Sequence, residues 1–304
     1  MVKIIMRIAK GLRLAGFIYS PFTNLIPMNK KKMKIKSPSK RLLRKYTYLK
    51  REDGSWMKIL VKKPKNQKTK VGIFWVHGGG YVTGSSSMAK ISMAKHLAKE
   101  YVIVSPDYTL GIYKPYPAAL NDCYQALLWM RDNAKDLGIS PDEIVVGGDS
   151  AGGGMAVALS LYARDKGDIK IKCLIPMYPM IDDRMNTNSM IGNKAPVWDE
   201  RNNRKAWSIY LEGIPEDKVS KYAAPARETD YTNLPPTITF VGSIEPFFDE
   251  TVTYVENLKK AGIKVAFKLY EGCFHAFDVM VPWSKQAKDA KEFILNNLNA
   301  FLKD

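Results

Sequence analysis

A regular alternation of apolar, β-branched runs with longer helical stretches, beginning at residue 46, constrains the fold most. Such runs predict buried strands, and strands that alternate with helices predict a parallel sheet covered by helices on both faces. The turn-rich segment 52–55 predicts a leading β-hairpin, which would supply antiparallel edge strands. The expected eight strands are 46–50, 56–62, 71–76, 101–105, 143–147, 172–177, 236–241 and 265–270, and the expected helices are 88–99, 118–137, 151–164, 249–260 and 285–302.

One block of about 40 residues, 182–225, interrupts this alternation and contains Trp198 and Trp207 but no clear strand. A long insertion after a core strand is typical of lids, and its tryptophans argue against full exposure to solvent. The sequence therefore predicts a domain at 46–304 with a cap insertion, preceded by a separate cap segment and linker at 1–45. The alternative for the insertion is a plain surface excursion.

The net charge of +17 comes from the first 70 residues. They hold 21 Lys and Arg against Glu52 and Asp53, whereas the remaining residues include 26 basic and 28 acidic ones. The chain after residue 70 therefore has no need to attract polyanions. The lysine run at 29–36 has no interleaved aromatic residues and matches no nucleic-acid reader motif, so we expect a solvated linker and no nucleic-acid partner.

Residues 1–22 have the pattern of an amphipathic basic helix. We expect a lid that packs its apolar side on the protein's own domain. The alternatives are peripheral contact with a membrane surface and a signal peptide, although charges recur through Arg13 and the following apolar run is short. No stretch approaches the roughly 18 apolar residues of a spanning helix. The apolar side would carry Ile4, Ile5, Ile8, Leu12 and Ala15, and the opposite side Lys3, Arg7, Lys10 and Arg13.

Three cysteines, Cys123, Cys173 and Cys273, lie in or beside apolar stretches and show no metal-ligand spacing. An odd number of such residues predicts reduced core cysteines and no metal site. Reduced cysteines favour a reducing compartment, so we expect a cytoplasmic protein, membrane-associated if residues 1–22 contact a bilayer. A secreted protein without disulfides is the alternative.

The segment Gly148-Asp149-Ser150-Ala151-Gly152 follows one expected strand and precedes an Ala- and Leu-rich helical stretch. Its G-x-S-x-G pattern predicts a strand-to-helix turn too tight for side chains at the glycines, which holds the serine hydroxyl above the sheet. The alternative is a phosphate-binding loop, but neither the P-loop nor the dinucleotide-binding pattern occurs here. Ser150 is therefore the candidate nucleophile.

Three successive glycines follow another expected strand, in His77-Gly78-Gly79-Gly80. Backbone N–H groups in such a run approach a ligand closely, as stabilisation of an oxyanion requires. We expect the N–H groups of Gly79 and Gly80, with Gly78 as their neighbour, to form an oxyanion hole with the N–H of Ala151. A flexible turn is the alternative.

A serine nucleophile needs a base, and the chain has three histidines. His77 belongs to the glycine loop, and His96 lies on an expected amphipathic helix, where a surface or structural role is the better interpretation. His275 follows the last expected strand, where the base of a Ser, acid, His order belongs. His275 is therefore the candidate general base, with a structural role as the alternative.

The candidate carboxylates that would orient this base follow the expected strand at 236–241. Glu245 is the first acid past the strand end, and Pro246 stiffens the turn. Asp249 is the rival, although its position suits a cap of the next helix. We predict that Glu245 is the acid.

The chain carries four motifs together: His77-Gly78-Gly79-Gly80, Tyr116-Pro117-Ala118-Ala119-Leu120-Asn121-Asp122, Gly148-Asp149-Ser150-Ala151-Gly152-Gly153 and His275-Ala276-Phe277. With them it resembles the α/β-hydrolase superfamily and, within it, the hormone-sensitive-lipase-like carboxylesterases, over roughly residues 45–304. The resemblance implies an α/β-hydrolase fold with a helical cap. It also implies hydrolysis of carboxylic esters, of short to medium acyl chains, without metal or organic cofactor.

Two segments depart from the family's pattern. The family usually has Asp where this chain has Glu245, so the longer acid must reach His275 from a slightly different backbone position. Family members also tend to have an Arg-Leu-Ala-Pro-Glu-like segment after Asp-Tyr, which 109–113 replaces here.

The sequence therefore predicts a serine carboxylesterase that acts on a small-molecule ester through an acyl-enzyme. A deacetylase or lipase using the same residues is one alternative. A non-catalytic ligand-binding relative is another, although such relatives typically lose a member of the triad. A peripheral membrane or nucleic-acid binder would rest on the first 70 residues alone.

Overall fold

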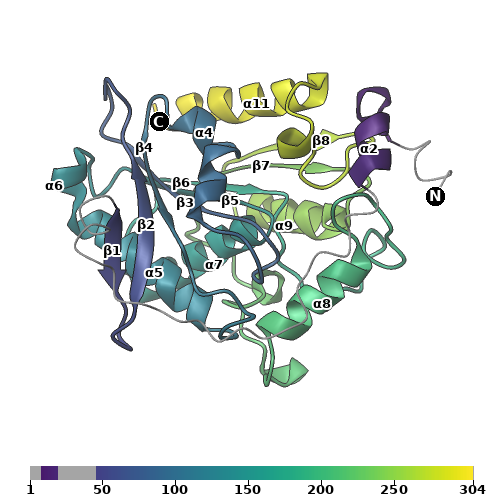
Figure 1. Cartoon of the computed structure of the whole chain (residues 1–304), viewed down its shortest axis with the longest axis horizontal. Coiled ribbons are helices and arrows are strands. Elements are labelled where there is room, and N and C mark those ends of the chain that lie inside the picture. Colours follow the sequence, from purple (N-terminus) through teal and green to yellow (C-terminus); the bar gives the residue numbers. More distant parts are fainter. Residues whose placement is uncertain (1–7, 20–45, 304) are drawn as a thin grey trace.

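The computed structural model describes residues 8–19 and 46–303, and within them an eight-stranded sheet lies at the centre of the molecule (Figure 1). The strand order is β1-β2-β4-β3-β5-β6-β7-β8, and β2 pairs antiparallel with both β1 and β4, while all other pairs are parallel. The predicted sheet and its leading hairpin are thus confirmed. The strands are β1 Thr47–Lys50, β2 Trp56–Lys62, β3 Gly72–Val76, β4 Val102–Pro106, β5 Ile144–Asp149, β6 Cys173–Met177, β7 Thr237–Gly242 and β8 Val265–Tyr270.

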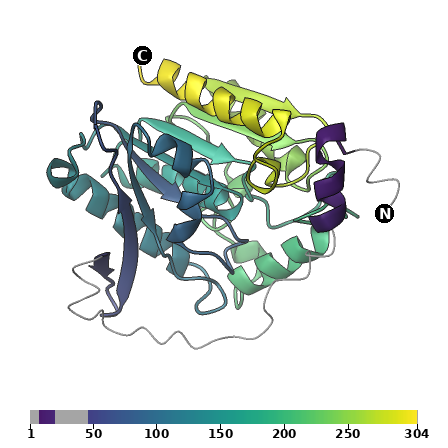
Figure 2. The same ribbon diagram turned by 45° about the horizontal axis from the view of Figure 1, so that its top comes forward.

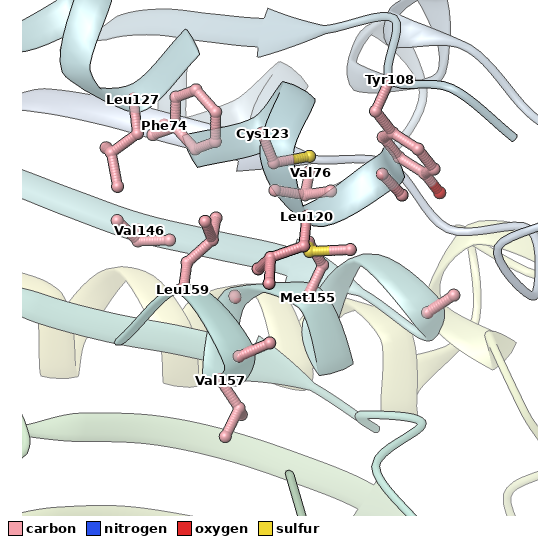
Figure 3. Packing of buried hydrophobic residues seen from close by; sticks show 14 of the residues in the cluster. Phe74, Val76, Tyr108, Leu120, Cys123, Leu127, Val146, Met155, Val157 and Leu159 are labelled. Atoms are coloured by element: carbon pink, nitrogen blue, oxygen red, sulfur yellow. The ribbon is translucent and has the colours of Figure 1, made fainter. Parts of the chain in front are cut away.

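Helices cover both faces of the sheet, because successive strand residues point to opposite sides and both sides are apolar. In β3, Phe74 and Val76 join one buried cluster, whereas Ile73 and Trp75 join the other. The first cluster includes α5 Ala118–Asp132, α7 Ala151–Lys166 and α9 Phe248–Lys260; the second includes α4 Ala94–Leu97 and α11 Lys285–Phe301. Figure 3 shows α5 and α7 side chains packed around β3 and β5 in the first cluster.

Two predicted helices are each divided in the structure. The stretch 88–99 forms a 3₁₀ turn, η3 Ser86–Lys90, and the short α4. The stretch 118–137 forms α5 and α6 Ala134–Leu137, which meet at Asn133. The Asn133 amide donates to the Trp129 carbonyl at 2.8 Å, so its side chain bonds to the backbone where the helix ends.

The insertion 182–225 has no strand, as predicted, but it contains one substantial helix, α8 Glu200–Tyr210. The Asp199 carboxylate caps this helix by accepting from the N–H of Asn202 at 2.9 Å. Short 3₁₀ turns, η4 Glu216–Lys218 and η5 Pro225–Arg227, follow it. All three free cysteines are buried in the core.

The N-terminal segment forms a 3₁₀ turn, η1 Lys10–Leu12, and a helix, α2 Arg13–Tyr19, which lies beside the start of α11 (Figure 2). Ile8, Leu12 and Ala15 are buried in the second cluster, so this part of the apolar side packs on the protein's own domain. The alternative of membrane contact through residues 1–22 stays a prediction, because Leu14 and Ile18 of α2 are exposed. Ile4, Ile5, Lys3 and Arg7 lie outside the described residues. Within the described ranges, no helix combines the length and apolar character needed to cross a bilayer.

Candidate active site

Ser150 lies at the corner between β5 and α7, at the carboxyl edge of the sheet. Its backbone has φ 59° and ψ −122°, a strained conformation for a residue with a side chain. The corner is tight because a Cβ at Gly152 would collide with the Val76 carbonyl, and one at Gly148 with the Gly152 carbonyl. The G-x-S-x-G pattern therefore forms the expected turn, and its glycines are required by close backbone approach.

Ser150, His275 and Glu245 form a continuous row of hydrogen bonds. The Ser150 Oγ is 2.8 Å from His275 Nε2, and His275 Nδ1 is 2.5 Å from Glu245 Oε2. All three residues are buried. Because a carboxylate faces Nδ1, that nitrogen carries the proton, and Nε2 is left to accept the serine proton.

The second carboxylate oxygen of Glu245 is also held. Glu245 Oε1 accepts from the N–H of Gly242, at the end of β7, with a distance of 2.8 Å. The same side chain is thus fixed at both oxygens, one by the backbone and one by His275. The family usually has Asp at this position, and the longer Glu245 side chain still reaches His275 Nδ1.

Asp249, the rival acid, forms hydrogen bonds with other residues. Its Oδ2 accepts from the N–H of Ser189 at 2.7 Å, and its own N–H donates to Ser189 Oγ at 3.0 Å. Asp249 thus ties the start of α9 to the insertion and does not reach His275 among the contacts of the described residues.

The glycine loop lies directly against the serine. A Cβ on Gly78 would be 3.3 Å from that of Ser150, and an Asp149 carboxylate oxygen would be within 2.8 Å of it. In the described part of the chain, no acceptor bonds to the N–H groups of Gly79, Gly80 or Ala151. Three donors without protein acceptors beside a serine hydroxyl are suited to a developing oxyanion.

Two aromatic side chains, those of His77 and Tyr108, pack against each other and hold the glycine loop by hydrogen bonds. His77 Nδ1–H donates to the Gly78 carbonyl at 2.8 Å, and burial lowers the pKa of His77 to about 4, which keeps the ring neutral. Tyr108 stacks on His77 with centroids 4.2 Å apart and donates its hydroxyl to the His77 carbonyl at 3.1 Å. His96 lies on α4 and lines a surface hollow away from these residues.

The segment that departs from the family's pattern also supports this region. Asp122, the last residue of the Tyr116–Asp122 motif, accepts from the Thr109 N–H at 2.7 Å and from Arg51 Nε at 2.7 Å. These bonds fix the chain that follows Tyr108, and therefore the ring beneath the glycine loop.

Two carboxyls near His275, the buried Asp149 and the partly buried Asp278, were not predicted from the sequence. Burial raises the pKa of Asp149 to about 6, against a hydrogen bond from Trp75 Nε1 at 3.1 Å. Burial also raises the pKa of Asp278 to about 7, although the Tyr178 hydroxyl donates to it at 2.9 Å. Asp278 stands three residues after His275 in the sequence, a spacing that could have drawn attention to it.

Aromatic side chains enclose the His275 ring. Tyr178 and Phe247 meet it edge to face, with centroids 4.9 and 5.1 Å away, and Trp198 lies 6.3 Å away. Three rings on different chain segments leave the imidazole little freedom to turn. They also limit the access of water to the His275–Glu245 pair.

The insertion covers the glycine loop. A Cβ on Gly80 would lie 2.5 Å from the Trp198 ring and 3.2 Å from Ala206 of α8. Tyr210, also on α8, stacks on Tyr81 with centroids 4.2 Å apart. The sequence did not predict this contact, because it joins segments that are far apart in the chain.

The described residues contain no group of three or more His, Cys, Asp or Glu side chains placed to hold a metal ion. The side chains that meet at the carboxyl edge of the sheet are those of Ser150, His275 and Glu245, beside the backbone of the glycine loop. This arrangement on a sheet of this strand order defines an α/β-hydrolase.

The comparisons with known proteins agree with this class. Residues 73–279 match the model of a family described as having the alpha/beta hydrolase fold, which is more than half of the chain. The chain therefore belongs to this family, and the resemblance predicted from the motifs is confirmed.

Individual relatives group the chain with carboxylic ester hydrolases. It is 31% identical over 225 residues to an esterase of Acinetobacter venetianus, covering 72% of this chain and 71% of that protein. It is 30% identical over 219 residues to an AB hydrolase superfamily protein of Schizosaccharomyces pombe, covering 66% of this chain and 61% of that protein, less than two thirds of its length. A solved bacterial heroin esterase is 29% identical, with a TM-score of 0.83 and 98% of both chains covered.

Proposed function

We propose that the chain is a serine carboxylesterase that hydrolyses small-molecule esters of short to medium acyl chains. The observation that carries the proposal is the row Ser150–His275–Glu245, beside three backbone N–H groups that no acceptor of the described residues occupies. The esterases among its relatives support the same reaction.

The chemistry follows from the positions of the atoms. Ser150 Oγ attacks the ester carbonyl carbon while His275 Nε2 takes its proton, and the carbonyl oxygen becomes an oxyanion. The N–H groups of Gly79, Gly80 and Ala151 stabilise that oxyanion, with Gly78 holding the loop beside the serine. When the carbon–oxygen bond to the alcohol breaks, His275 returns the proton to the departing oxygen, leaving an acyl-enzyme.

Water then completes the reaction. His275 takes a proton from a water molecule as its oxygen attacks the acyl carbon, and the proton passes to Ser150 Oγ as the acid is released. Throughout, the Glu245 carboxylate keeps the proton on Nδ1 and stabilises the imidazolium that forms in each step. Both roles depend on the 2.5 Å contact between Glu245 and His275.

We further propose that the N-terminal segment and residues 182–225 form the lid; of the predicted cap segment and linker at 1–45, only 8–19 lie within the described residues. Trp198 and Ala206 lie over Gly80, and α2 packs against the loop that carries His275, where the Ala9 N–H donates to the Gly272 carbonyl at 2.9 Å. Bulky aromatic side chains over the glycine loop leave limited room for the acyl group, which supports short to medium chains. The buried free cysteines support a reducing compartment.

The test is hydrolysis of 4-nitrophenyl esters from acetyl to dodecanoyl, with Ser150→Ala as the control. We expect turnover that peaks at short to medium acyl chains, and one covalent adduct with an organophosphonate that Ser150→Ala lacks. Absence of both turnover and adduct in the parent protein would leave the non-catalytic ligand-binding alternative. A peak at the longest acyl chains would favour a lipase, and a preference for acetylated sugars or arylamides would favour a deacetylase.

A further inference from the structure

A large hollow in the described surface lies away from Ser150. It has a volume of about 1120 Å³ and is formed by the β2–β3 connection, the end of α4 and the end of α11. Seven lysines line it against two glutamates, Glu100 and Glu143. None of the seven lysines makes an ion pair with a carboxylate of the described residues, and Glu143 pairs instead with Lys172 at 3.6 Å. The lysines are Lys62, Lys63, Lys65, Lys68, Lys70, Lys99 and Lys303.

A second hollow continues the same surface along α4 and α11. Lys95, Lys288 and Lys291 line it together with His96. Burial lowers the pKa of His96, and Lys291, Lys99 and Lys95 lower it further, so these ammonium groups lie close enough together to repel an added positive charge. We call the surface of both hollows the lysine face. In Figures 1 and 2, α4 and α11 lie side by side on one side of the sheet.

Large apolar side chains are exposed at the lysine face. Ile91 lines the second hollow and is 61% exposed, and Trp283 follows Pro282 of the same hollow and is 67% exposed. Clusters of lysines with exposed tryptophan and aliphatic side chains are typical of surfaces that bind the interface of an anionic bilayer. A large exposed apolar residue within a charged surface also costs solubility unless it has a partner.

We propose that the lysine face docks on a membrane surface rich in anionic lipid headgroups, with Trp283 and Ile91 entering the interfacial layer. Nucleic acid fits the observations less well. The only aromatic residue among the described lining of the larger hollow, Tyr101, is buried and donates its hydroxyl to Asn299, so it is not placed to stack on a base.

The docking surface does not include the catalytic row. Ser150 stands at the carboxyl end of β5, whereas the larger hollow lies beside the opposite end of β3, whose first residues pair with the start of β5. A bilayer that meets the larger hollow therefore lies away from Ser150, whereas the second hollow, which Asp278 also lines, lies nearer to His275.

The experiment is flotation of the full chain with vesicles of phosphatidylcholine alone or with about one third phosphatidylglycerol. The test variant carries Lys65→Gln, Lys68→Gln, Lys70→Gln and Lys99→Gln. The matched control carries Lys135→Gln, Lys166→Gln, Lys259→Gln and Lys260→Gln, an equal loss of charge on α6, α7 and α9, which pack on the other face of the sheet. Both variants keep the basic N-terminal segment.

We expect binding to the anionic vesicles alone, weaker in higher salt. It should fall about tenfold or more in the test variant and less than about twofold in the control, since each lysine near the surface adds appreciable attraction. Trp283→Ala should lower it about fivefold at unchanged charge. Hydrolysis of a soluble ester should stay unchanged in the test variant, the control variant and Trp283→Ala. Unchanged hydrolysis shows that the three variants are folded, and it is measured independently of vesicle binding.

Two results would overturn the proposal. Equal losses in the test and control variants would mean that total charge, and not this face, attracts the vesicles. Tighter binding to a 20-base-pair DNA duplex than to anionic vesicles, lost in the test variant but retained in Trp283→Ala, would assign the lysine face to nucleic acid.

Discussion

Replacing Glu245 by Gln tests the candidate acid most directly, because it keeps the size of the side chain and removes its charge. Gly242 N–H donates to Glu245 Oε1 at 2.8 Å, so the amide oxygen of Gln must take that position to avoid an unsatisfied buried donor. The amide NH₂ then faces His275 Nδ1, which becomes an acceptor. The imidazole proton moves to Nε2. Because Nε2 then carries a proton, it can no longer accept the proton of the Ser150 hydroxyl.

The expected loss combines this wrong tautomer with the loss of charge beside the imidazolium. An amide in place of a triad carboxylate lowers kcat by roughly 10⁴-fold, which corresponds to about 5 kcal/mol of transition-state stabilisation. The assay is initial-rate hydrolysis of 4-nitrophenyl acetate and butyrate, with thermal unfolding as the check on folding. Asp249→Asn is the matched control, and it should lose less than about tenfold because Asp249 contacts Ser189. A larger loss in Asp249→Asn than in Glu245→Gln would refute the assignment.

Three other substitutions test further parts of the structure. Trp198→Ala removes the ring over Gly80 and should raise kcat/KM for octanoyl relative to acetyl esters by about tenfold; an unchanged ratio would mean that the ring does not limit the acyl group. Asp149→Asn concerns stability: the pKa of about 6 lies above the ordinary 3.8, so the protonated carboxyl stabilises the fold at low pH, and this contribution disappears as the pH rises through 6. Urea unfolding at pH 5 and 8 should show the variant gaining up to about 3 kcal/mol at pH 8 relative to the parent, and about half as much at pH 5, which already lies above the ordinary pKa of 3.8. Leu12→Ala should cost about 2 to 4 kcal/mol of α2 docking and speed tryptic cleavage at Arg13 without a matching fall in the global Tm; equal falls would show that α2 unfolds only with the whole domain.

The sheet was predictable from the sequence because each core strand is a short apolar run whose two faces are both buried. Val145 and Val146, for example, belong to opposite clusters, so no alternation of polar residues hides the strand. Helix ends were less predictable. The break at Asn133 depends on one side-chain bond to Trp129, which a helical pattern does not reveal.

The meeting of the three site residues was also predictable from the sequence, because parallel strands bring the loops that follow them to the same edge of the sheet. Ser150, Glu245 and His275 each follow a strand, and they meet there. Contacts across the chain could not be read in this way. The position of Trp198 over Gly80 depends on the path of the insertion, and no local pattern specifies that path.

The packing of α2 has a consequence for how the chain is made. Ile8 and Leu12 join a buried cluster with Phe274 and Phe277, which follow them in the chain by about 260 residues. At about 5 to 20 residues per second, the intervening chain takes about 13 to 50 s to synthesise. During that time these apolar side chains have no native partner among the later residues. The apolar side of this segment therefore stays without its native partners until the segment that carries Phe274 and Phe277 has been synthesised.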